Sequence, residues 1–226
     1  LYPGEVLGLS GLVGSGRTEV LRAIFGADTS ARGTVRLDGK PFRLGSISSA
    51  VRRGIGYVPE DRASEGYVPM SSERSNLISA NLDWINRARL FVNRQQERDV
   101  SNRMIQLLNV RPADPNAHVI NLSGGNQQKI VLGKWLARDL KVLLVDEPTA
   151  GVDVGAKDEI YAHIETLTAQ GAAVLLVSSD LTELLRLSNR IMVLRRGRII
   201  RRLLAGEADE ERLLTIASGL EGEDPA

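Results

Sequence analysis

The sequence contains no cysteine, no long apolar run and no excess of charge of either sign. Without cysteine, the 226-residue chain has no disulfide scaffold and suits a reducing compartment. No apolar run approaches the roughly 18 residues that span a bilayer, and no signal peptide is recognisable. We therefore expect any membrane role to come through a partner protein. The chain has 29 basic and 28 acidic residues, so its net charge is close to zero. No overall positive potential favours nucleic acid, and we expect no nucleic-acid partner.

Hydrophobic residues make up 42% of the chain, enough for an ordinary globular core with or without a subdomain. The most informative segment is residues 122–153. Its apolar stretch at 142–145 is bounded by polar residues and predicts a buried strand, which Asp146 and Glu147 follow. Open α/β sheets bind ligands outside the carboxyl ends of their strands. Asp146 is thus placed to hold magnesium, and Glu147 to orient and deprotonate an attacking water.

A glycine-rich turn, Ser123-Gly124-Gly125, begins the same segment and leads into a helix predicted over residues 126–137. Backbone N–H groups at the start of a helix have no intrahelical acceptor. Together with the serine hydroxyl they suit a phosphate group.

A second glycine-rich loop lies between a strand predicted at residues 5–9 and a helix predicted at 18–25, which is the context that a P-loop requires. Its candidate nucleotide-binding residues are Gly11, Gly14, Ser15, Gly16, Arg17 and Thr18. The glycines let backbone N–H groups turn toward phosphates, and Thr18 is placed to ligate magnesium. The usual pattern has lysine where this chain has Arg17, whose planar fork is larger than an ammonium. We expect nucleotide to bind with altered phosphate geometry.

Three motifs in 122–153 resemble those of the ATP-binding cassette (ABC) ATPases. LSGGNQQK is similar to the signature motif, VLLVDEPT to the Walker B segment and AGVD to the D-loop. The resemblance implies an α/β P-loop NTPase fold: an ABC-type RecA-like core with a mixed sheet, a partial antiparallel β subdomain and a helical subdomain. It also implies ATP and Mg²⁺ as cofactors, and it adds Asp153 of the D-loop to the nucleotide-binding residues.

Two positions depart from the family pattern. After the strand predicted at 55–58, the family usually has a glutamine that touches magnesium and the attacking water, and here Glu60 stands in its place. Glu60 could still ligate magnesium, but it adds negative charge. After the strand predicted at 173–177, Ser179 replaces a histidine that contacts the γ-phosphate. Serine does not titrate near neutral pH. Glu60 and Ser179 thus join Glu147 as candidate catalytic residues of a site that we expect to be degenerate.

Residues 67–119 are rich in Asn, Arg and Gln, and helices are predicted at 75–82 and 95–108. The resemblance implies that 67–119 form the helical subdomain that contacts the membrane permease, with Trp84 and Phe91 as candidate contacts. Residues 1–66 and 120–226 would form the nucleotide-binding core, including a β-hairpin. The elements predicted there are a hairpin at 34–44, helices at 46–53, 154–169 and 207–220, and strands at 190–194 and 198–203.

The substitutions at positions 17, 60 and 179 indicate which subgroup of the ABC ATPases the chain resembles. Together with GLVGSGRTE, GIGYVPEDR, NLSGGNQQK and DEPTAGVDVGAK, they resemble the C-terminal cassette of the fused two-cassette ATPases of bacterial ribose-, galactose- and xylose-type importers. The chain begins almost at the P-loop strand, so we expect it to be a piece of a longer polypeptide.

This narrower resemblance implies an ATPase that couples ATP binding and hydrolysis to carbohydrate import. Its partners would be an N-terminal cassette, arranged head to tail, the permease subunits and, indirectly, a periplasmic sugar-binding protein. It would lie peripherally at the cytoplasmic face of the bacterial inner membrane and be soluble when isolated. Two alternatives stay open: a non-catalytic regulatory nucleotide-binding module, and a soluble ABC protein acting on ribosomes or DNA.

Overall fold

The computed structural model describes residues 1–82, 86–87 and 91–220, with 86–87 and 91–92 described by their backbone alone. Trp84 and the side chain of Phe91 therefore lie outside the described part of the chain. The chain forms two compact units. The first comprises Leu1–Tyr57, Lys141–Glu147 and Leu167–Ala226, and the second Val58–Leu140 and Pro148–Thr166.

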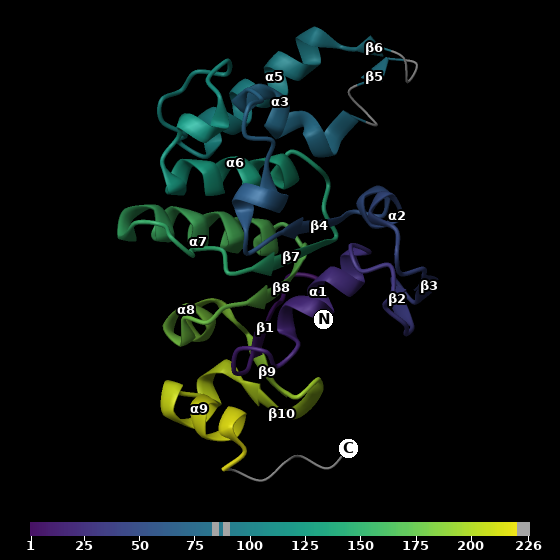
Figure 1. The fold of residues 1–226 in the computed structure, drawn as a ribbon, viewed down its shortest axis with the longest axis vertical. Coiled ribbons are helices and arrows are strands. Elements are labelled where there is room, and N and C mark those ends of the chain that lie inside the picture. The colour runs from purple at the N-terminus through teal and green to yellow at the C-terminus, as the bar shows by residue number, and fades with distance from the viewer. Residues whose placement is uncertain (83–85, 88–90, 221–226) are drawn as a thin grey trace. The chain divides into compact units, whose positions relative to one another are not determined.

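A six-stranded sheet in the order β10-β9-β1-β8-β7-β4 lies at the centre of the first unit (Figure 1). β9, β1, β8 and β7 run parallel, whereas β10 is antiparallel to β9, so the predicted mixed sheet is confirmed. The residues of β1, β4 and β8 are buried throughout, as expected for strands covered on both faces. The strands are β1 (Val6–Ser10), β4 (Ile55–Val58), β7 (Val142–Asp146), β8 (Ala173–Val177), β9 (Arg190–Arg195) and β10 (Arg198–Leu204).

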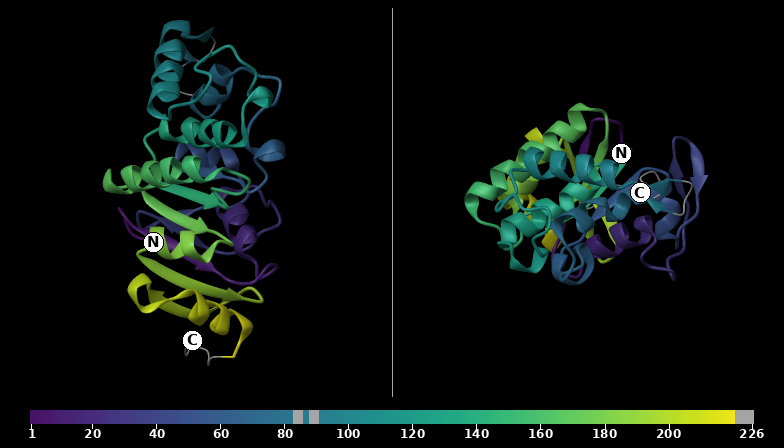
Figure 2. Two further views of the ribbon diagram at one scale, coloured as in Figure 1. Left: turned by 90° about the vertical axis from the view of Figure 1, so that its left-hand side faces the viewer. Right: turned by 90° about the horizontal axis from the view of Figure 1, so that it is seen from above.

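Helices cover both faces of this sheet. α1 (Arg17–Phe25) packs on β7 and β8, whereas α8 (Leu181–Leu187) and α9 (Glu210–Ser218) pack on β1 and β9 from the opposite side (Figures 1 and 2). α8 was not among the predicted elements. Its start has a capping signal, because Asp180 Oδ1 accepts a hydrogen bond from the N–H of Glu183, three residues on (3.2 Å).

The predicted hairpin consists of β2 (Val35–Leu37) and β3 (Lys40–Phe42). Asp38 and Gly39 connect the strands with φ values of +51° and +72°, the two-residue turn that matches the twist of paired strands. The short helix α2 (Ile47–Arg52) follows, and the Ser46 hydroxyl caps its first turn. The hairpin and this helix are therefore confirmed.

The second unit is mainly helical. It contains α3 (Glu73–Ile78), α5 (Arg94–Leu107), α6 (Gly124–Leu136) and the greater part of α7 (Val154–Ala169), with the short strands β5 (Asn86–Arg87) and β6 (Phe91–Val92). Leu77, Met104, Leu108 and Ile130 form the centre of its core. Gly133 lets these residues approach closely, because a Cβ there would lie 2.5 Å from Leu108 Cδ1.

This unit extends beyond the 67–119 segment predicted as the helical subdomain, since α6 and most of α7 also belong to it. The predicted contact of 67–119 with a permease stays a prediction. Among the residues that the structure describes, no helix combines the length and apolarity needed to cross a membrane.

Glu73, in the first turn of α3, is a fully buried carboxyl group. Neither of its oxygens has a hydrogen-bond partner among the described residues. Burial, and to a smaller extent the charge of Asp114, raises the pKa of Glu73 from 4.5 to about 7. The folded chain thus holds this proton more tightly than the unfolded chain. The contribution of this proton to the free energy of unfolding is fully present below about pH 4.5, and it is lost as the pH rises through about 7.

We expect Glu73→Gln to remove this pH dependence, because an amide stays neutral. Between about pH 5 and about pH 8, the free energy of unfolding should fall by about 1–3 kcal/mol more in the wild type than in the variant. Urea unfolding at both pH values measures the difference. Glu211→Gln, on the exposed side of α9, is the control and should behave like the wild type. Equal pH dependence in wild type and Glu73→Gln would contradict this assignment.

Candidate functional site

The glycine-rich loop of residues 11–16 leaves the carboxyl end of β1 and enters α1. A Cβ on the first glycine would lie 2.3 Å from the carbonyl oxygen of Leu194, so the backbone there leaves no room for a side chain. The N–H of Gly197 donates to the carbonyl of Ser15 (2.9 Å), which attaches the loop to the β9–β10 turn. Its glycines have positive φ values: Gly11 (+153°), Gly14 (+78°) and Gly16 (+103°).

Arg17 is the first residue of α1, and its guanidinium turns toward the end of β8. Nη1 donates a hydrogen bond to the carbonyl of Ser178 (3.0 Å), the residue directly after that strand. Thr18 follows in the first turn of the helix and is partly buried. The helix N-terminus and the guanidinium both carry positive charge, so this corner suits an anion.

Glu147 and Ser179 lie together, although 32 residues separate them in the sequence. Glu147 directly follows β7 with φ +49°, a conformation that costs a non-glycine residue about 1–3 kcal/mol. Its N–H donates to the carbonyl of Val177 (2.9 Å), which continues the pairing of β7 with β8. The hydroxyl of Ser179 donates to Oε2 of Glu147 (3.0 Å). The structure therefore brings these two predicted catalytic residues into contact.

Asp146, the last residue of β7, is fully buried. Its Oδ2 accepts a hydrogen bond from the hydroxyl of Tyr57 (3.5 Å). A carboxylate from Asp146 and a hydroxyl from Thr18 are oxygen ligands, and magnesium uses few protein ligands because it retains water. Glu60 is exposed and belongs to the second unit, so its place beside Thr18 and Asp146 stays a prediction.

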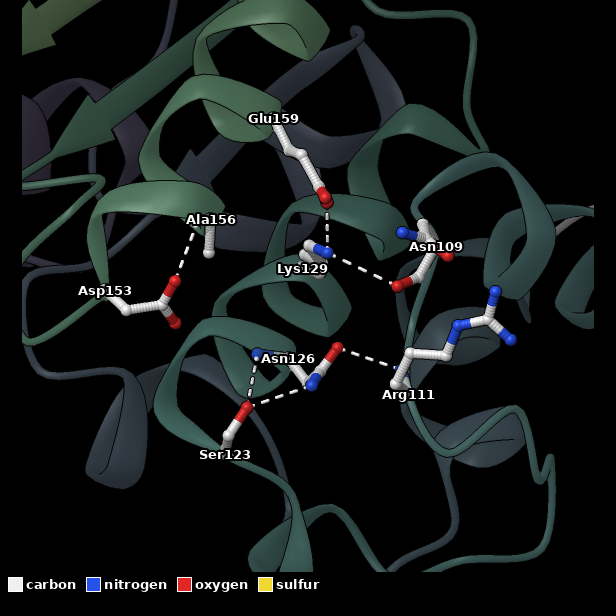
Figure 3. A network of polar contacts seen from close by, with 8 residues as sticks. All are labelled: Asn109, Arg111, Ser123, Asn126, Lys129, Asp153, Ala156 and Glu159. Carbon is white, nitrogen blue, oxygen red and sulfur yellow. Dashed lines mark hydrogen bonds and ion pairs between the residues drawn. The ribbon is translucent and has the colours of Figure 1, made fainter.

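Ser123 caps the start of α6 (Figure 3). Its Oγ accepts hydrogen bonds from the backbone N–H (3.4 Å) and the side-chain amide (2.9 Å) of Asn126. Asn126 is held in turn, because its Oδ1 accepts from the N–H of Arg111 (2.9 Å). A hydroxyl that accepts twice keeps its single hydrogen for another acceptor. Ser123 is thus arranged to donate toward an anion.

The two signature glycines are needed for packing within the second unit. A Cβ on Gly124 would lie 2.8 Å from the carbonyl oxygen of Gly151, and one on Gly125 would lie 2.9 Å from Cβ of Ala156. Asp153 caps α7, because its Oδ1 accepts from the N–H of Ala156 (3.0 Å; Figure 3). The side chain of Asp153 therefore has a local structural role in addition to any contact with nucleotide.

A cavity of about 290 Å³ lies beside Ser123, Gly125, Asn126 and Asp153. The buried ammonium of Lys129 borders it, forms an ion pair with Glu159 and donates to the carbonyl of Asn109 (3.3 Å; Figure 3). We did not predict these contacts from the sequence. Lys129 is the last residue of LSGGNQQK, but its partner lies 30 residues further along the chain, so no local spacing indicates the pair.

Sequence reasoning also missed Arg62. It follows the predicted ligand Glu60 by two residues, and its guanidinium contacts the D-loop. A single arginine in a charged loop gives no pattern that predicts such a contact, so only the folded chain reveals it.

A family model described as "ABC transporter" matches residues 1–150. The chain is 50% identical over 215 residues to the arabinose import ATP-binding protein AraG of Pseudomonas syringae pv. syringae, a match that covers 95% of this chain and 42% of the relative. It is 50% identical over 214 residues to the ribose import ATP-binding protein RbsA 1 of Streptomyces avermitilis, covering 95% and 41%. The chain thus spans about two-fifths of the length of these relatives.

Solved structures show the same fold. The ATP-binding cassette MJ0796, dimeric in a post-hydrolysis state with ADP and Pi, matches with a TM-score of 0.76 and 23% identity, covering 89% of this chain and 86% of that one. A nucleotide-free ATP-binding cassette from an ABC transporter matches with a TM-score of 0.76 and 21% identity, covering 97% and 87%. The predicted α/β P-loop NTPase fold is confirmed. By its motifs, its fold and its relatives, the chain belongs to the ABC transporter family.

Proposed function

We propose that the chain is an ATP-binding cassette of a bacterial sugar importer and the C-terminal one of two fused cassettes. The relatives that support this are named as arabinose and ribose import ATP-binding proteins and are 46–50% identical to the chain. ATP binding and hydrolysis would drive carbohydrate transport through a permease, fed by a periplasmic sugar-binding protein. The cassette would act at the cytoplasmic face of the inner membrane.

The P-loop would bind MgATP through the residues that surround the start of α1. Hydrolysis is an in-line attack of water on the γ-phosphate, in which catalysis comes mainly from positioning and electrostatics. Glu147 would orient and deprotonate the water. Bound Mg²⁺ would neutralise charge on the phosphates. The proposed roles are phosphate binding by Gly11, Gly14, Ser15, Gly16 and Arg17, and magnesium binding by Thr18, Asp146 and Glu60.

The observation that carries the proposal of a degenerate site is the hydrogen bond from Ser179 to Glu147. Serine has one hydroxyl hydrogen, and here it is donated to the proposed base. That hydrogen is then not available for the γ-phosphate. The guanidinium of Arg17 is also partly engaged by the protein, because its Nη1 donates to the carbonyl of Ser178. We infer slow hydrolysis at this P-loop.

The signature of this chain would serve a different nucleotide. In a head-to-tail pair, Ser123, Gly124, Gly125 and Asp153 would complete the site whose P-loop belongs to the N-terminal cassette. Ser123 supports this role because it is exposed and its Oγ already accepts two hydrogen bonds, which leaves its hydrogen for another acceptor. A second candidate, a purely regulatory nucleotide-binding module, is favoured by the same contacts of Arg17 and Ser179, and measured turnover separates the two.

Purified chain should bind MgATP but show negligible ATP turnover at every protein concentration. The reason is that its P-loop site lacks both the usual lysine and an imidazole donor. Phosphate release, measured over about a hundredfold range of concentration with excess magnesium, tests this. Glu147→Gln is the matched control and should give the same background rate. Specific activity that rises with concentration and disappears in Glu147→Gln would contradict the degenerate site.

Restoring the family residues should restore turnover. We expect Arg17→Lys combined with Ser179→His to raise the turnover of the purified chain at high concentration about tenfold or more, because an imidazole can donate where serine does not. Adding Glu147→Gln to the same chain should abolish the gain. A double variant that binds ATP without faster turnover would show that other residues limit this site.

A further inference from the structure

Arg62 contacts two segments that lie far from it in the sequence. Its Nη1 donates to the carbonyl of Ala150 in the D-loop (2.6 Å). Nη2 lies 3.5 Å from the carbonyl oxygen of Gly151, and Nε lies 3.5 Å from Oε1 of Gln127 in the first turns of α6. Because the Ala150 bond is short and its donor is charged, it is the strongest of the three contacts.

The guanidinium occupies space that the signature leaves open. A Cβ on Gly124 would lie 2.7 Å from Nη2 of Arg62, and one on Gly151 would lie 3.5 Å from it. The missing side chain at position 124 therefore makes room for the arginine as well as for the D-loop carbonyl. Moving the guanidinium would change how residues 150–151 lie against the start of α6.

The backbone of Arg62 is itself held firmly. It begins the turn Arg62–Gly66, in which the carboxylate of Asp61 accepts from the N–H groups of Ala63 (3.0 Å) and Ser64 (3.2 Å). Lys134 of α6 donates to the carbonyl of Gly66 (2.5 Å) at the other end of the turn. Glu60 is two residues before Arg62, so a displacement of the loop that carries Glu60 would be transmitted to the guanidinium through this hydrogen-bonded turn.

We infer that Arg62 is a positioning residue that holds residues 123–127 and 150–153 in one arrangement and couples them to the Glu60 loop. The inference rests on the proposed function, because the signature would complete a neighbouring cassette's site. The planar guanidinium is essential to it. A planar guanidinium can donate hydrogen bonds to several acceptors in one plane, whereas the compact ammonium of lysine has no such planar set of donors.

Hydrogen exchange on the purified chain tests the contact. In Arg62→Ala, backbone amides in 123–127 and 150–153 should exchange about tenfold faster together, and Arg62→Lys should show a smaller change. Arg103→Ala, an exposed arginine on α5, is the control and should change neither segment. Unchanged exchange, or loosening of one segment alone, would overturn the inference.

ATP turnover of the two-cassette protein tests the consequence. Arg62→Ala should lower kcat about tenfold while the KM for ATP changes less than about twofold, and Arg62→Lys should recover part of kcat. A kcat within about twofold of wild type would overturn the coupling. A wild-type protein with no ATP turnover would instead contradict the proposed function, and hydrogen exchange would then decide the Arg62 contact independently.

Discussion

The parallel pairing of β1, β8 and β7 is the constraint on which the candidate site depends. Leu9 lies opposite Val177, and Val177 lies opposite Asp146, so the three strands end at the same level. The glycine loop, Ser178 with Ser179, and Glu147 therefore leave the sheet side by side. A shift of one residue in this register would reverse the side-chain directions in the shifted strand and separate Ser179 from Glu147.

The two compact units carry different sets of candidate functional residues. The first unit holds the P-loop, Glu147 and Ser179, while the second holds the signature glycines and Arg62. In the first, one N–H of Arg17 and the hydroxyl of Ser179 already donate to protein acceptors. In the second, Ser123 is held by Asn126 in a way that leaves its hydrogen available. This contrast is the physical basis for proposing that the chain contributes more to a neighbour's nucleotide than to its own.

Much of the fold was predictable, because its signals are local. The helix at 154–169 and the strands at 55–58 and 173–177 have the predicted bounds, since apolar runs and flanking turn residues mark their ends. α8 was missed although Asp180 and Glu183 have capping spacing. The contacts of Arg62 and Lys129 could not be predicted, because they join residues up to 89 positions apart. The Ser179–Glu147 bond likewise depends on strand register rather than on any motif.

The most direct test of the asymmetry is ATP turnover of the full two-cassette protein with single substitutions in this cassette. Ser123→Ala should lower turnover about tenfold or more, because a donor to the partner cassette's nucleotide is lost. Glu147→Gln should leave turnover within about twofold of wild type, because this cassette's own site contributes little. The reverse pattern, with turnover lost in Glu147→Gln and retained in Ser123→Ala, would contradict the account.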